Sequence, residues 1–346
     1  MDLPNRPIRL KHLVRVLRDV SDPLILTHND PDPDALAAAV GLQFLLRKTA
    51  KLHSRVRYGG IVGRPENKAL LGILKPRPRP LPRRAKIDPG SVVLVDCQPG
   101  FGNNPIAAGE RVAAVFDHHG ASEEPWEARL PVLRSDLGAT ATIVTLWLME
   151  ERIQPTAALA TGLFYGIKTD TLGLARGASQ DDVNAFLFLQ RRLDAEALAE
   201  IESAPVGREY FGFLHAAARN ALIRGGIVTC DLGNVDRPDL PAEMADLLGR
   251  LDEAKWTIVV GEFRRCLYLA VRTRLRRGRA GRLAASVVGS RGMAGGHGSI
   301  AGGQIPLKRG SGEALAREIL QGFVDALGPP AEPSVPLVVP KADLSA

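Results

Sequence analysis

The sequence predicts an α/β protein in which a parallel-sheet domain is joined by a helical linker to a smaller α/β domain. Through the first half, short continuous apolar runs alternate with longer helix-like runs, which is typical of parallel strands with helices on both faces of the sheet. A helical stretch of mixed charge follows, and strand-like runs then resume. The length of 346 residues also suits two domains.

The first half contains three strand-like runs, each of which ends at a histidine or an aspartate. These runs are PLILTH (23–28), SVVLVD (91–96) and RVAAVFD (111–117). Each is short and apolar, as expected of strands buried inside a sheet. Longer apolar runs with the length of helices cover 34–48, 139–152 and 156–170. We therefore expect a first domain over residues 1–195.

The second half predicts a helical linker over 196–222, a second domain over 223–329 and a flexible proline-rich tail over 330–346. Strand candidates in this domain cover 225–232, 257–263 and 266–275, followed by a glycine-rich stretch at 289–307 and a helix at 312–327. A basic, proline-rich stretch at 75–90 is predicted to be a surface loop in the first domain, either a solvated connection or a nucleic-acid contact.

Composition narrows the class of protein. The net charge of +7 favours anionic partners, whereas an aromatic content of 5% argues against a long base-stacking groove. The three cysteines are scattered without zinc-type spacing, which suits a reducing compartment. The N-terminus lacks the apolar core of a signal peptide, and no apolar run is long enough to span a bilayer. We therefore expect a cytoplasmic protein with no membrane contact.

Ionisable side chains gather where the predicted strands end. His28, Asp32 and Asp34 follow the first strand, Asp96 closes the second, Asp117, His118 and His119 close the third, and Asp170 ends a helix-like run. In open parallel sheets, ligands bind outside the carboxyl ends of the strands. Any one of these groups alone is more often an acidic turn or a helix cap. Together they offer oxygen and imidazole donors for a pair of Mn²⁺ or Mg²⁺ ions, a centre that suits phosphoester cleavage.

Five motifs in this order carry a family resemblance. HNDPDPDA (28–35), VLVD (93–96), FDHH (116–119) and GIKTDT (166–171) resemble the motifs of the DHH phosphoesterase superfamily. GGHGSIAG (295–302) resembles the GGH motif of the DHH-associated C-terminal domain. The resemblance implies an active site in the cleft between the two domains.

The resemblance also implies roles for individual residues. One divalent metal ion would be held by His28, Asp32 and Asp96. The second would be held by Asp34, Asp96, His118 and Asp170, so that Asp96 bridges the pair. Mn²⁺ is the expected metal, with Mg²⁺ or Co²⁺ as alternatives. His119 would contact the scissile phosphate or assist the leaving oxygen, and Asp117 would orient its neighbours. Asp30 has no expected metal role.

Substrate binding is expected in the second domain. Arg272, Arg274 and Arg276 alternate along a strand candidate and would share one face, where guanidinium groups suit phosphate oxygens. For Arg274 and Arg276 an ordinary solvated edge is an equal alternative. The resemblance places Arg272 at a substrate-binding position and implies that Gly295, Gly296 and His297 form the substrate-binding loop.

The two-domain layout, with GGH present and no room for an OB-fold, resembles the NrnA-like nanoRNases of the superfamily. We expect hydrolysis of very short RNA, down to dinucleotides, to nucleoside monophosphates. Dephosphorylation of 3′-phosphoadenosine 5′-phosphate (pAp) is a further expected activity. One alternative is a cyclic or linear dinucleotide phosphodiesterase of the cyclic di-AMP type, and another is a non-catalytic nucleic-acid-binding module. The expected partners are short RNA or other small nucleotide phosphoesters, and a homodimer is compatible with the resemblance.

Overall fold

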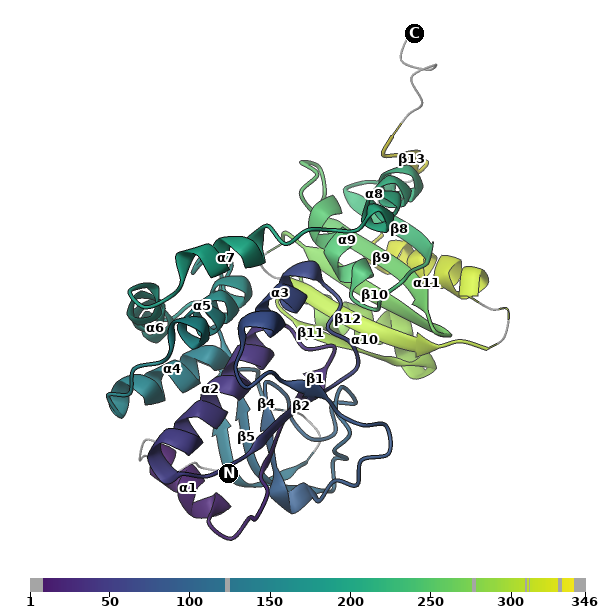
Figure 1. Ribbon diagram of the computed structural model, residues 1–346. Helices are drawn as coiled ribbons and strands as arrows, with labels where there is room; N and C mark the ends of the chain where they lie inside the picture. Colours follow the sequence, from purple (N-terminus) through teal and green to yellow (C-terminus); the bar gives the residue numbers. More distant parts are fainter. Residues whose placement is uncertain are drawn as a thin grey trace. The chain divides into compact units, whose positions relative to one another are not determined.

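The computed structural model describes residues 9–121, 125–275, 278–308, 310, 312–328 and 332–338. The chain forms two compact units, Met1–Ala204 and Pro205–Ala346 (Figure 1). The division falls inside the segment 196–222 that was expected to be a helical linker. Within the described residues, no helix combines the length and apolar character needed to cross a membrane.

The first unit is built on a six-stranded sheet in which every pair of neighbouring strands is parallel. Its strands are β1 (Leu24–Asn29), β2 (Arg55–Gly59), β3 (Arg79–Pro80), β4 (Val92–Val95), β5 (Arg111–Asp117) and β6 (Glu127–Leu133). Their order across the sheet is β3-β2-β1-β4-β5-β6. The chain therefore runs outward from β1 in one direction and then from β4 in the other. The carboxyl ends of β1 and β4 form the switch point at which such sheets bind ligands.

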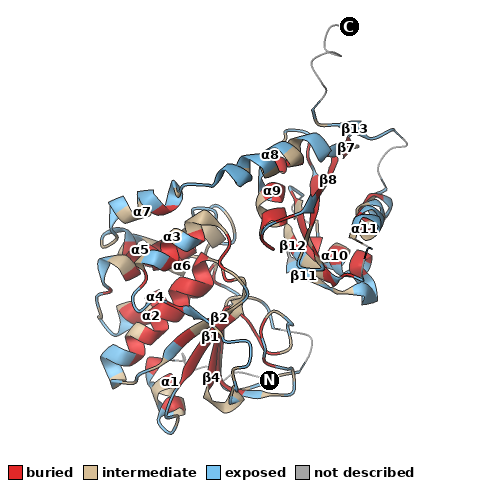
Figure 2. Ribbon diagram, turned by 45° about the vertical axis from the view of Figure 1, so that its right-hand side comes forward, coloured by how far each residue is buried: buried red, intermediate tan, exposed pale blue. Residues whose placement is uncertain are grey.

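Helices cover one face of this sheet. They are α1 (Leu10–Leu17), α2 (Pro33–Ala50), α3 (Pro65–Ile73), α4 (Thr140–Glu150), α5 (Ala157–Asp170), α6 (Gln180–Gln190) and α7 (Ala195–Glu202). All of them contribute to one apolar cluster with inward strand residues such as Ile25, Val93 and Phe116. α2 is apolar nearly all round and is buried along most of its length, as Figure 2 shows. Such a helix must be covered on all sides, here by the sheet, α4 and α5.

The expectation of helices on both faces is wrong for the residues described. On the second face, Leu26 and Leu94 of the strands pack beneath loop residues such as Ile87 and Ile106. Right-handed crossovers place the connections after β4 and β5 on this face. The first of them, QPGFGNNP (98–105), is rich in proline, glycine and asparagine, which disfavour a helix. Loops, with the short 3-10 turn Pro89–Ser91, therefore form the cover.

The second unit contains a mixed seven-stranded sheet with the order β11-β12-β10-β9-β8-β7-β13. Its strands are β7 (Leu222–Arg224), β8 (Ile227–Asn234), β9 (Trp256–Phe263), β10 (Cys266–Thr273), β11 (Met293–His297), β12 (Ile300–Pro306) and β13 (Val335–Pro336). Among the described strands of this second sheet, only β8 and β9 pair in parallel. Helices α8 (Arg208–Asn220) and α9 (Leu240–Leu248) pack on one face, and α10 (Ala280–Val288) and α11 (Gly312–Leu327) on the other.

Parts of the expected linker and of the expected tail belong to the folded units. Within 196–222, α7 packs in the first unit and α8 in the second, where Ala217 joins an apolar cluster with Val228. Within the expected tail 330–346, Val335–Pro336 pairs with β7, and residues 339–346 lie outside the described part of the chain.

Candidate metal centre

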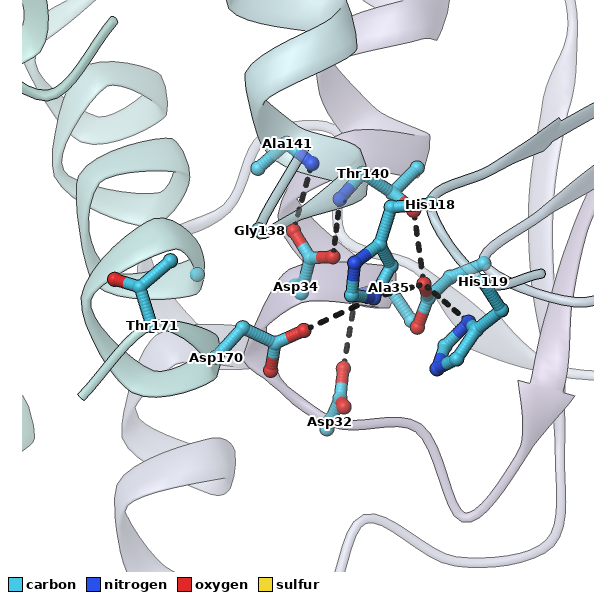
Figure 3. Close-up of polar contacts among 12 residues, drawn as sticks. Asp32, Asp34, Ala35, His118, His119, Gly138, Thr140, Ala141, Asp170 and Thr171 are labelled. Atoms are coloured by element: carbon cyan, nitrogen blue, oxygen red, sulfur yellow. Dashed lines mark hydrogen bonds and ion pairs between the residues drawn. The ribbon is translucent and has the colours of Figure 1, made fainter. Parts of the chain in front are cut away.

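The ionisable residues singled out in the first half of the sequence lie together at the carboxyl end of the first sheet. They come from the ends of β1, β4 and β5, the start of α2 and the end of α5 (Figure 3). Three groups of side chains have ligand atoms within 4.8 Å of one another, namely His28, Asp32 and Asp96, then Asp34, His118 and Asp170, and finally Asp96, His118 and His119.

The first group lies where β1 passes into α2. His28 Nε2 is 3.5 Å from Asp96 Oδ2 and 3.9 Å from Asp32 Oδ1. His28 Nδ1 lies 2.8 Å from the carbonyl oxygen of Asn29, so this nitrogen carries the proton and donates it to the carbonyl. The tautomer leaves Nε2 free to bind a cation. Asp32 caps α2, because its Oδ1 accepts a 2.9 Å hydrogen bond from Ala35 N–H.

The second group includes a carboxylate fixed by a helix N-terminus. Asp34 is fully buried, and its two oxygens accept 2.7 Å hydrogen bonds from Thr140 N–H and Ala141 N–H in the first turn of α4. These backbone donors and the helix dipole stabilise an anion at this position. His118 Nε2 lies 3.3 Å from Asp170 Oδ2 (Figure 3).

Asp96 is shared between the groups. Its φ of 61° lies in the left-handed region, which is strained for a non-glycine residue but tolerated by aspartate. Its Oδ1 accepts a 2.8 Å hydrogen bond from Thr140 Oγ1 and lies 3.6 Å from His118 Nε2, while Oδ2 faces His28. This turn after β4 therefore directs one carboxylate toward both groups.

His119 and Asp117 form a hydrogen-bonded pair beside these groups. His119 Nδ1 lies 2.7 Å from Asp117 Oδ1, which also accepts a 3.0 Å bond from His119 N–H. Gln98 Nε2 donates a 2.7 Å bond to Asp117 Oδ2 and a 3.0 Å bond to the carbonyl of Gly120. Asp117 is buried, whereas the His119 side chain keeps 33% of its surface exposed. Asp117 therefore fixes the ring orientation of an accessible imidazole.

The electrostatics of the centre reflect four carboxylates in a small volume. Burial raises the pKa of Asp34, and the charges of Asp170 and Asp96 raise it further. Burial and the charge of Asp32 raise the pKa of Asp170 to about 6. Burial opposes protonation of His118, but Asp170 and Asp96 outweigh it and raise its pKa to about 11. These groups compete for positive charge, which bound cations would supply.

The residues present fit divalent cations. His118 Nε2 is buried and forms no hydrogen bond of good geometry among the described residues, although it lies 3.3 Å from Asp170 Oδ2 and 3.6 Å from Asp96 Oδ1, so this nitrogen faces the carboxylates of the cluster. The remaining donors are imidazole nitrogen and carboxylate oxygen, a set that suits Mn²⁺, Mg²⁺ or Co²⁺. A buried polar atom without a well-formed hydrogen bond is costly unless a ligand satisfies it.

The second unit has a separate pocket of about 240 Å³ lined by Arg279, Gly281, Arg282, Gly296 and Gly298. Gly281 permits the close approach of α10 to β11, because a Cβ there would lie 2.0 Å from Gly296 O. Gly295 is exposed on β11 next to the lining residue Gly296. The side chain of His297 lies outside the described part of the structure.

The structure does not bring Arg272 or Arg274 to this pocket. Arg272 Nε donates a 2.5 Å hydrogen bond to Oδ1 of Asp246 on α9. Arg274 Nη1 donates to the carbonyls of Leu251 and Asp252. Arg276 lies outside the described residues.

Sequence reasoning missed the residues that support the ligands. Gln98 lies two positions after Asp96, and Thr140 opens α4, yet neither belongs to a motif of ionisable residues. Arg279 and Arg282 stand just before the glycine-rich stretch, and substrate binding was expected instead from the arginines of the preceding strand candidate. A glutamine two residues after the acid that ends an apolar strand was the available signal for Gln98.

Comparison with known proteins agrees with the fold and the motifs. Residues 23–167 match the DHH family, N-terminal domain. An uncharacterised protein from Methanocaldococcus jannaschii is 32% identical over 285 residues, which is 82% of this chain and 58% of that protein. The chain thus spans little more than half the length of this relative. The first unit therefore contains a domain that matches the DHH family, and the matched residues include every member of the centre described above except Asp170.

A solved structure shares the fold at low identity. An exopolyphosphatase-related protein from Bacteroides fragilis superposes with a TM-score of 0.68 at 14% identity, covering 92% of this chain and 97% of that one. A pGpG-specific phosphodiesterase from Vibrio cholerae covers 88% of this chain and 99% of its own with a TM-score of 0.33 at 13% identity, a superposition too loose to indicate a shared substrate.

Proposed function

We propose that the protein is a metal-dependent phosphoesterase that hydrolyses very short RNA, down to dinucleotides, to nucleoside monophosphates. The observation that carries the proposal is the pair of ligand groups joined through Asp96, with the buried Nε2 of His118 facing the carboxylates of Asp96 and Asp170. The match to the DHH family supports the same class of chemistry.

In this proposal His28, Asp32 and Asp96 hold one cation, and Asp34, His118 and Asp170 hold the other together with Asp96. When bound, divalent cations supply Lewis-acid chemistry, which activates water and neutralises charge on phosphoryl oxygens. Asp34 is kept in position by the α4 backbone, so the second group is preorganised for its ligand. His119, oriented by Asp117, contacts the scissile phosphate or assists the leaving oxygen.

The second unit would bind the rest of the substrate. Arg279 and Arg282 flank a pocket of about 240 Å³, which suits a phosphate or part of a nucleotide better than a long polymer. Gly296 in its wall lets the backbone approach a ligand closely. Arg272, Arg274, Gly295 and His297 remain proposed contributors to substrate binding on the strength of the sequence motifs.

A substrate panel tests the proposal. Purified protein with Mn²⁺ is incubated with a labelled RNA dinucleotide, a longer RNA, pAp, cyclic di-AMP and pyrophosphate, and Asp34→Ala serves as the matched inactive control. Fastest turnover of the dinucleotide, lost in Asp34→Ala, is expected. Preferred hydrolysis of pyrophosphate or cyclic di-AMP would replace the proposed substrate. Retention of RNA with no turnover of any compound would favour a binding module.

A further inference from the structure

The outer edge of the first sheet, formed by β2 and β3, gathers four arginines. Val56 and Tyr58 of β2 join the helix-covered core, so Arg55 and Arg57 point to the opposite face. The Cα of Arg57 pairs with that of Arg79 on β3, which places these side chains next to each other. Arg77 is exposed just before β3. We call Arg55, Arg57, Arg77 and Arg79 the arginine edge.

The positive charge of the arginine edge is not balanced. Asp22 forms an ion pair with Arg55 at 2.5 Å. Among the described residues, no carboxylate forms an ion pair with the other three arginines. Burial lowers the pKa of Arg57, and the charges of Arg55 and Arg79 lower it further. The fold therefore brings like charges together where they repel.

The loop that follows β3 extends the same charge. Arg83, Arg84 and Lys86 are all exposed, and no acidic residue occurs between Glu66 and Asp88. Charged side chains and prolines protect sheet edges from pairing with other chains. β3 is only two residues long and contains a proline, so this edge is already protected from such pairing. Edge protection alone therefore does not account for the number of cations.

The chemistry of this surface selects its ligand. Arginine forks match phosphate oxygens, and a row of them suits a polyanion better than a single small phosphate. The exposed large apolar residues of the described chain include none between 51 and 90, so nothing there would insert into a membrane. The ring of Tyr58, between the arginines of β2 and β3, is buried in the core and offers bases no stacking platform.

We propose that the arginine edge binds the phosphate backbone of an RNA strand longer than the fragments that the metal centre cleaves. The choice of RNA among polyanions rests on the proposed function, whereas the phosphate chemistry of the surface does not. Binding is independent of base sequence and of divalent metal, and it weakens steeply with salt.

The test is fluorescence anisotropy with the full chain in EDTA, using labelled poly(U) as the probe over a range of salt concentrations. The variant Arg57→Gln/Arg79→Gln is compared with Arg111→Gln/Arg129→Gln, which removes the same charge from β5 and the opposite edge strand β6. We expect the first variant to lose on the order of tenfold in affinity at low salt and to lower the salt slope by about 1.4, as two phosphate contacts require. The control should bind like the wild type.

Several results would overturn the proposal. One is equal poly(U) affinity in the wild type and in Arg57→Gln/Arg79→Gln. Another is an equal loss of affinity in the control variant, which would mean that binding depends on the total charge of the protein and not on the arginine edge. Arg77→Gln/Arg79→Gln, at two exposed positions, gives the same readout should the Arg57 variant fail to fold. Loss of binding to phosphatidylserine vesicles with RNA binding intact would assign the surface to membranes. If RNA binding depends on the arginine edge but the protein does not hydrolyse a dinucleotide, the result contradicts the proposed function and leaves the proposal for the arginine edge standing.

Discussion

Asp34 and Thr140 are 106 residues apart in the chain, yet Thr140 N–H donates a 2.7 Å hydrogen bond to Asp34 Oδ2. A second bond, from Ala141 N–H, holds the other oxygen at 2.7 Å. One carboxylate therefore satisfies two backbone donors of α4 that would otherwise lack partners at the helix start. The same contact places Asp34 within the group that contains His118 and Asp170.

Replacing Asp34 by alanine should affect both activity and folding. The change removes a proposed metal ligand and leaves two buried N–H groups without an acceptor, which costs about 1–3 kcal/mol for each unsatisfied group. We expect no measurable turnover of a dinucleotide and a lower urea midpoint. Full activity in a folded Asp34→Ala protein would refute the assignment of this ligand.

The acids of the first motif should differ from one another. Asp30 has a φ of 55°, and its Oδ1 accepts a 2.7 Å bond from Ile61 N–H, roles that asparagine can also fill. Asp30→Asn should therefore change kcat/KM only slightly. Asp32→Asn and Asp34→Asn should lower kcat/KM by more than about 100-fold, which exceeds the usual effect of replacing a residue that only supports a metal ligand. Equal effects at the three positions would mean that the motif acts through bulk charge.

Gln98 should act through Asp117. In Gln98→Ala the buried Asp117 Oδ2 loses its 2.7 Å donor, so the His119 ring is held less firmly. We expect kcat to fall about 10- to 100-fold with a smaller change in KM. Isothermal titration with Mn²⁺ should give an affinity close to that of the wild type, because Asp117, the carboxylate that Gln98 holds, is not a proposed metal ligand. A large loss of metal affinity with kcat unchanged would contradict this role.

Gly166 should control how closely α5 approaches α2. A Cβ at Gly166 would lie 3.0 Å from Asp34 Cα and 3.3 Å from Asp34 Oδ1. Gly166→Ala should therefore displace Asp34 or Asp170, which follows four residues later on α5, and reduce activity. Gly72→Ala on α3 is the matched control, since no atom lies within 4 Å of its added methyl group. Comparable activity in the two variants would show that this contact tolerates a methyl group.

Divalent metal should stabilise the first unit. Binding to the folded state alone adds RT ln(1 + [L]/Kd), about 2.7 kcal/mol when the metal concentration is a hundred times Kd. We expect Mn²⁺ to raise Tm and EDTA to reverse the rise in a thermal melt. The shift should shrink in His118→Ala, which removes a proposed ligand nitrogen from the second group. An unchanged Tm with Mn²⁺ in the wild type would count against a metal centre.

The strands and helices of the first unit were largely predictable, because periodicity and apolar runs are local properties of the sequence. The runs ending at His28, Asp96 and Asp117 correspond to β1, β4 and β5. The cover of the second sheet face was not predictable in this way. The right-handed crossover from β4 to β5 places the segment 98–105 on that face. The composition of this segment indicates only that it is not a helix, and does not indicate which face of the sheet it covers.

The sequence by itself determined which ionisable residues gather at the proposed metal centre, because residue type and position at strand ends are visible in one dimension. Only the tertiary structure decided how they are supported. The donors to Asp34 are backbone N–H groups, which every residue but proline has, and Gln98 reaches Asp117 by a contact between separate loops. The arginine edge likewise arises from the pairing of β2 with β3, since strand register alone places Arg57 beside Arg79.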